Sequence, residues 1–164
     1  MTVPEVNPGV PRWPHAATVS SRGGSMANTP AGETVETLRL PGIGWLLQWR
    51  SDGCWRELSD AQNSAEHDGA HAPASDEWAR WSGSIQPQAR GGGWDGTRVW
   101  WLLYGELPDD AAANVVLADG AQPPVLSLGQ LWACEWESVA QAATVHVAGN
   151  KFDIPFTEPH YRRR

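Results

Sequence analysis

The chain is poor in lysine, phenylalanine, tyrosine and cysteine, and these shortages exclude several kinds of protein. Its 164 residues include one lysine, two phenylalanines, two tyrosines and two cysteines, and the formal net charge is -7. A nucleic-acid-binding surface must neutralise phosphates, so we expect no nucleic-acid partner for a chain this acidic. No apolar run approaches the length of a membrane span, and no apolar segment near the N-terminus resembles a secretion signal. We therefore expect a cytoplasmic protein without a membrane partner.

The two cysteines, Cys54 and Cys134, form no C-x-x-C pair. They indicate neither a structural zinc site nor a redox motif. In the cytoplasm we expect both to be reduced, buried thiols, whereas in an oxidising compartment they could link neighbouring strands. Eleven arginines against one lysine suggest the GC-rich genome of a bacterium and carry no information about function.

The sequence is organised around the apolar run Val99–Tyr104, which lies between Gly96 and Gly105. A run this short, rich in aromatic residues and bounded by glycine, is typical of a strand that is buried on both faces. Successive side chains of a strand point to opposite sides, so we expect two sets of side chains, each of which needs a cover. One set is Val99, Trp101 and Leu103, and the other is Trp100, Leu102 and Tyr104.

Short segments elsewhere also have strand character, with turn signals between them and no convincing long helix. About nine to ten short strands at this spacing predict an all-β fold, an antiparallel two-layer β-sandwich. We assign the sandwich to residues 33–158. Residues 1–32, rich in proline and without a sustained period, are expected to form a disordered leader, and 159–164 a basic, solvated C-terminal tail. Met26 lies within the leader, so translation could begin there rather than at Met1.

Two connections are expected to lack regular structure. Residues 59–76 carry no apolar side chain larger than alanine and are predicted to form a polar insertion loop. The glycine-rich stretch 91–96 leads into the strand at 99–104. Because no helix follows it and it holds no lysine, we interpret it as a linker and not as a phosphate cradle.

An Asp-Gly pair between the segments 45–50 and 54–58 predicts a hairpin whose register the sequence leaves open. A three-residue loop would place Trp49 opposite Trp55, and a two-residue loop would place Trp49 opposite Arg56. The two registers differ by one residue, so they present different side chains to solvent.

Candidate catalytic and metal-ligating residues are few. A two-residue loop at 149–150 would place His146 opposite Asp153, but a hydrolase would also need a nucleophile, and no G-x-S-x-G motif occurs. We interpret this pair as a cross-strand surface contact. His67 and His71 have the spacing of a helical metal pair, yet the neighbouring glycine and proline argue against a helix, and no further ligand cluster follows. We assign no catalytic residue, no metal site and no cofactor.

Tryptophan is the one residue type in excess, with 11 copies. They could build the core and shield its edges, or some could serve as surface anchors. Trp55, Trp94, Trp100 and Arg98 are the predicted binding residues. The leading hypothesis is a non-catalytic module that docks onto a protein partner through this aromatic patch, as an inhibitor, an immunity protein or an assembly subunit would. The alternatives are a carbohydrate-binding β-sandwich and an enzyme of unrecognised type that uses the histidine–aspartate pair.

Overall fold

The computed structural model of the protein describes residues 34–42, 44–70, 77–94 and 99–155, without the side chains of 90–94 and 99. The predicted leader and the predicted basic tail lie outside the described residues. Within these ranges the elements, in chain order, are β1 (Val35–Leu40), β2 (Trp45–Arg50), β3 (Cys54–Ser59), α1 (Asp60–His67), β4 (Ala79–Arg80), β5 (Gln88–Trp94), β6 (Val99–Glu106), β7 (Ala113–Leu117), β8 (Leu126–Leu128), β9 (Leu131–Ser138), β10 (Ala143–Val147) and β11 (Asn150–Ile154).

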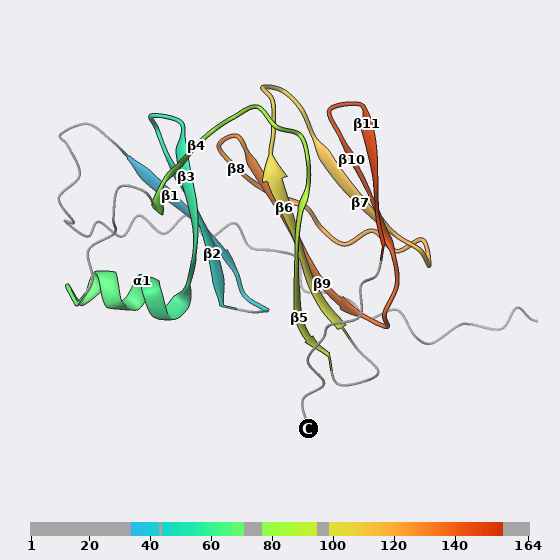
Figure 1. The fold of residues 1–164 in the computed structure, drawn as a ribbon, viewed down its shortest axis with the longest axis horizontal. Coiled ribbons are helices and arrows are strands. Elements are labelled where there is room, and N and C mark those ends of the chain that lie inside the picture. Colours follow the sequence, from blue (N-terminus) through green and yellow to red (C-terminus); the bar gives the residue numbers. More distant parts are fainter. Residues whose placement is uncertain (1–33, 43, 71–76, 95–98, 156–164) are drawn as a thin grey trace, which may run out of the picture.

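The strands form three antiparallel sheets. The N-terminal sheet has the order β1-β2-β3-β4, the central sheet β5-β6-β9-β8, and the C-terminal sheet β11-β10-β7. Figure 1 shows the central sheet between the other two, along the long axis of the molecule. The predicted all-β, antiparallel, sandwich-like class is confirmed, with three sheets in place of the two predicted layers.

β6 lies in the interior of the central sheet, between β5 and β9, and is covered on both faces as its sequence predicts. Trp101 and Leu103 pack in a core with the C-terminal sheet, to which Val115 and Val145 contribute. On the opposite face, the other predicted set of side chains packs against the N-terminal sheet, in a core formed with Leu40, Leu47 and Trp55; this set consists of Trp100, Leu102 and Tyr104. Each face of the strand is thus covered by a different sheet.

The hairpin between β2 and β3 has the register of the three-residue loop. Trp49 pairs with Trp55, and Arg56 pairs with Gln48. Gly53 has a φ of +83°, a conformation that glycine adopts without strain. Trp49 and Trp55 therefore both face the central sheet, whereas Arg56 points away from it.

The predicted insertion loop at 59–76 contains a helix, α1, so that prediction is wrong for residues 60–67. Ser59 and Gln62 form a capping box: the Ser59 hydroxyl accepts from the Gln62 backbone N–H, and the Gln62 side chain accepts from the Ser59 backbone N–H. These bonds satisfy donors that a helix N-terminus otherwise leaves unpaired. None of the helix residues is buried. An element with no buried side chain has no apolar period, so periodicity gives no sign of it.

The glycine-rich stretch predicted as a linker belongs in part to β5, which pairs antiparallel with β6 and shifts register between Gly91 and Trp94. Glycine has no side chain that could show alternation, so the sequence pattern misses this strand. Its backbone provides hydrogen-bond partners for β6 on the side away from β9.

The predicted register of the last hairpin is also wrong. His146 pairs with Lys151, and Asp153 pairs with Thr144, so His146 and Asp153 do not face each other. The turn lies at Ala148 and Gly149, both with positive φ, one residue earlier than predicted. Moving the turn by one residue shifts the pairing by two, which leaves the same side chains on the apolar face. The hydrophobic pattern therefore fits both registers equally well.

Candidate functional site

Of the four predicted binding residues, Trp94 and Trp100 belong to the same end of the central sheet. Trp100 is half-buried near the start of β6, and the backbone of Trp94 pairs with Val99, the residue before it. The side chain of Trp94 and the whole of Arg98 lie outside the described residues. Figure 1 shows that the start of β6, the end of β9 and the turn between β1 and β2 lie at this lower end of the molecule.

Trp55 lies elsewhere, in the core between the N-terminal and central sheets. Its side chain is 7% exposed, and its ring meets that of Tyr104 edge-on, with centroids 6.3 Å apart and an interplanar angle of 76°. Its indole N–H donates to Glu106 at 3.0 Å. In this structure Trp55 is a core residue and offers little surface to a partner.

Around Trp100 the structure brings together polar groups from three segments. Glu135, on β9, accepts a hydrogen bond from the backbone N–H of Gly42 at 3.2 Å. Its second carboxylate oxygen and the indole N–H of Trp100 are both buried and have no hydrogen-bond partner among the described residues. A Cβ added at Gly42 would lie 2.9 Å from that oxygen and 3.5 Å from the indole nitrogen. A side chain at this position would displace the Glu135 carboxylate.

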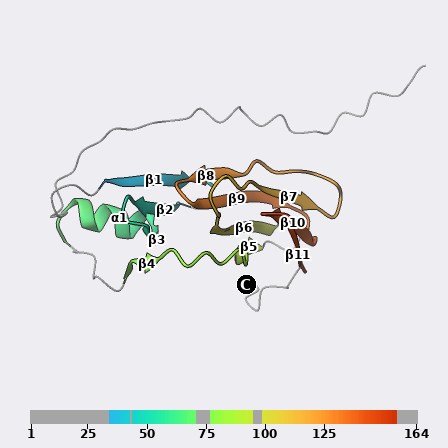
Figure 2. The ribbon, with the colours of Figure 1, turned by 90° about the horizontal axis from the view of Figure 1, so that it is seen from above.

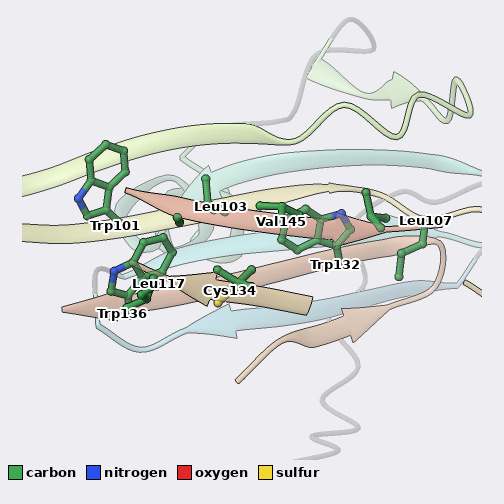
Figure 3. Packing of buried hydrophobic residues seen from close by; sticks show 11 residues of the cluster. Trp101, Leu103, Leu107, Leu117, Trp132, Cys134, Trp136 and Val145 are labelled. Atoms are coloured by element: carbon green, nitrogen blue, oxygen red, sulfur yellow. The ribbon is translucent and has the colours of Figure 1, made fainter. Parts of the chain in front are cut away.

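On the other face of the central sheet, Trp101 and Trp136 form a stacked pair with ring centroids 6.3 Å apart and an interplanar angle of 11°. Figure 3 shows this pair at one end of the core cluster and Trp132 at the other. With Gln141, Ile154 and Pro155 the two indoles line a shallow depression. The indole N–H of Trp136 is buried without a hydrogen-bond partner among the described residues.

The connection after β9 adds an exposed apolar side chain to this end of the molecule. Val139 is 61% exposed, and with Val35 it is one of the two large exposed apolar side chains within the described ranges. It follows Ser138, which pairs with Val99 at the start of β6, and Trp100 pairs with Glu137. We call this region the tryptophan end. Trp100, Glu137 and Val139 form its surface, and the indoles of Trp101 and Trp136, 8% and 7% exposed, belong to the core behind it.

The sequence interpretation missed one polar cluster, centred on Glu106 at the end of β6. This carboxylate is only 6% exposed. One of its oxygens accepts from Trp55, and the other accepts from the backbone N–H and hydroxyl of Ser82, both at 2.9 Å, and from the backbone N–H of Ser84 at 3.1 Å. Glu106 thereby fixes the segment between β4 and β5, which crosses from one sheet to the next (Figure 2). The sequence feature that could have pointed to this cluster is weak: it is the Ser-Gly-Ser segment at 82–84.

Within the described residues, the remaining candidates for chemistry are not brought together. His67 is an exposed residue at the end of α1, and His71 lies outside the described residues. Cys54 and Cys134 are buried free thiols, and burial raises the pKa of Cys134 to about 12, which leaves the thiol protonated and unreactive at neutral pH. No group of three histidine, cysteine or acidic side chains suited to a metal ion occurs in the part of the chain that the structure describes.

Within the same described ranges, no helix is long and apolar enough to span a membrane. The chain matches no protein-family model, no curated protein and no solved structure.

Proposed function

We propose that this protein is a non-catalytic docking module that binds a protein partner through the tryptophan end. The observation that carries the proposal is the exposure of Val139, at 61%, beside a strand end that holds the half-buried Trp100. Protein interfaces concentrate their binding energy in a few aromatic side chains near the centre of the contact, surrounded by polar groups. An inhibitor, an immunity protein or an assembly subunit would use such a surface.

The position of this surface favours docking over carbohydrate binding. It is built from strand ends and the connections between them, and connections held by a rigid sheet are where binding surfaces commonly lie. A sugar ring would stack on an indole face that is open to solvent. Every tryptophan side chain that the structure describes is buried or half-buried, so these indoles support an apolar contact better than they offer a stacking platform.

Paired valine variants test the proposal with little risk to the fold. Val139→Asp places a charge on the tryptophan end, and Val35→Asp makes the same change at a 41% exposed position on the N-terminal sheet. A partner isolated from an extract of the source cells with the wild-type chain should bind Val139→Asp at least about tenfold more weakly, the loss typical of a central contact. Its affinity for Val35→Asp should be unchanged.

The affinities are measured by titration calorimetry, and the two variants are first compared with the wild-type chain by circular dichroism. Equal affinity for the wild type and for folded Val139→Asp would refute docking at this end. Binding of an oligosaccharide that quenches tryptophan fluorescence, with no protein partner, would favour the carbohydrate alternative.

A further inference from the structure

The arginine side chains that the structure describes are gathered on one surface of an acidic protein. Each strand of the N-terminal sheet carries one arginine that points away from the central sheet: Arg39 on β1, Arg50 on β2, Arg56 on β3 and Arg80 on β4. Their orientation follows from strand alternation and pairing, since the residues beside or opposite them set which side faces the core. We call this surface the arginine face. Three of these arginines are paired with carboxylates: Arg39 with Asp60, Arg50 with Asp52, and Arg56 with Glu66 and Glu77.

Arg56 is the best-defined group on the arginine face and is 5% exposed. Its Nε donates to the Gln48 side chain at 2.8 Å, and its two terminal nitrogens donate to the two carboxylate oxygens of Glu66 at 2.8 and 2.6 Å. The guanidinium carbon lies 4.5 Å from the ring centroid of Trp78. A carboxylate of Glu77 lies 3.3 Å from one terminal nitrogen. Gln48 and Trp78 thus fix the plane of the guanidinium, and the paired N–H groups of its outer edge bind a carboxylate in two-point geometry.

The Glu66 carboxylate comes from α1, which is held on the arginine face by charge. α1 buries none of its side chains. Its first residue, Asp60, lies 2.7 Å from Arg39 in an exposed ion pair, and Glu66 in its last turn provides the buried contact with Arg56. An exposed pair contributes little, so most of the attachment depends on Glu66. A short helix with no buried side chain can leave the sheet once that one carboxylate is replaced.

We propose that Arg56, oriented by Gln48 and Trp78, is a carboxylate-binding site that Glu66 occupies as an internal ligand, and that a carboxylate of an acidic peptide can take its place when α1 undocks. The site is independent of the tryptophan end and does not rest on docking there. A guanidinium that is 5% exposed needs an anionic partner, because a buried charge without one is strongly unfavourable. When Glu66 leaves, Glu77 keeps one contact with Arg56, at 3.3 Å from a terminal nitrogen, and an external carboxylate restores the two-point contact.

Removal of the internal ligand tests this directly. Glu66→Ala leaves Arg56 without its two-point partner and should lower the melting temperature by about 5 to 10 °C. Sodium acetate, compared with sodium chloride at equal ionic strength, should restore stability in a saturable manner, by about 3 to 6 °C at ten times its dissociation constant. The matched control is Asp68→Ala, which removes an exposed carboxylate next to the same helix and should respond equally to both salts.

A second measurement follows the site itself. The Nε–H resonance of Arg56, observed by NMR, should shift on addition of acetate, or of a capped peptide of glutamates, in Glu66→Ala and not in Asp68→Ala. If Glu66→Ala does not fold, Glu66→Gln, which keeps one acceptor oxygen for Arg56, takes its place in the same titrations. Identical melting temperatures in acetate and chloride, with an unmoved Arg56 resonance, would overturn the proposal. A response to acetate without a response to the peptide would overturn its second half, the entry of an acidic peptide.

Discussion

Replacement of Glu106 is the sharpest test of how the N-terminal and central sheets are held together. The carboxylate is 6% exposed and accepts four hydrogen bonds, from the Trp55 indole and from three donors of Ser82 and Ser84. Glu106→Leu leaves all of these donors without an acceptor. The bond to Trp55 is fully buried, so its loss should cost about 2 kcal/mol, whereas the serine donors are partly exposed and regain water, for about another 2 kcal/mol together. We therefore expect unfolding to become easier by about 4 kcal/mol.

Glu106→Gln separates charge from shape in the same site. A carboxamide keeps one acceptor oxygen, but its NH2 group must face donors on the other side, so about half of the loss, or about 2 kcal/mol, should remain. The free energy of unfolding is measured by urea titration, with circular dichroism as the signal. The control is Glu36→Gln on the exposed part of β1, which should change stability by less than about 0.5 kcal/mol. If Glu106→Gln costs no more than this control, the hydrogen bonds of Glu106 to Trp55, Ser82 and Ser84 do not stabilise the fold.

Two further predictions concern a glycine and a thiol. At Gly129 the φ is +54° and an added Cβ would lie 2.5 Å from the ring of Trp49, whereas at Gly149 the φ is +74° and nothing lies within 4 Å. Gly129→Ala should therefore destabilise by about 3 kcal/mol or more and Gly149→Ala by about 1 kcal/mol in urea titrations, and equal costs would contradict the packing described. Cys134 should react with a maleimide only after unfolding. Because the unfolded chain releases the Cys134 proton at a lower pH than the folded chain, the stability contributed by the neutral thiol should be complete below pH 9.0 and should fall as the pH rises towards 12. Rapid labelling of the native protein at Cys134 would show that the site is open.

The part of the fold that could be predicted is the part where side chains alternate in character. On β9, Trp132, Cys134 and Trp136 face one core and Leu131 and Ala133 the other, as a period of two requires. The same reasoning predicts that both faces of β6 are covered. It does not say by what, because a side chain on a strand specifies that it needs an apolar neighbour and not which later segment supplies it. For this reason the third sheet was not predicted.

The elements that the sequence pattern missed are determined by features other than apolar periodicity. The only sequence signal for α1 is the capping pair Ser59 and Gln62, three residues apart, because none of the helix side chains is buried. β5 is largely glycine at its end and is defined by the hydrogen-bonding needs of β6. The register of the last hairpin depends on where the chain adopts positive φ, and Ala148 adopts it although the preference of its residue type is against it.

The predicted binding residues show the same limit, since a pattern indicates which face a tryptophan takes but not how deeply it is buried. Trp55 and Trp100 both contribute to the core between the N-terminal and central sheets. Trp55 is closed in by Tyr104 and Glu106, whereas Trp100 lies near the end of its strand, where the cover of the next sheet ends and a turn replaces it. Depth therefore follows from the position of a residue relative to the ends of other strands, which is tertiary information.

The two proposed surfaces differ in what binding would require of the protein. At the tryptophan end Val139 is already exposed, so a partner can dock without rearrangement, and the association rate should depend mainly on diffusion and orientation. At the arginine face Glu66 fills the site, so an acidic peptide must wait for α1 to leave or must displace it. The apparent affinity there is reduced by the fraction of time that the helix stays docked. A substitution that removes only the Glu66 carboxylate, such as Glu66→Ala, should therefore favour binding at the arginine face and leave the tryptophan end unaffected.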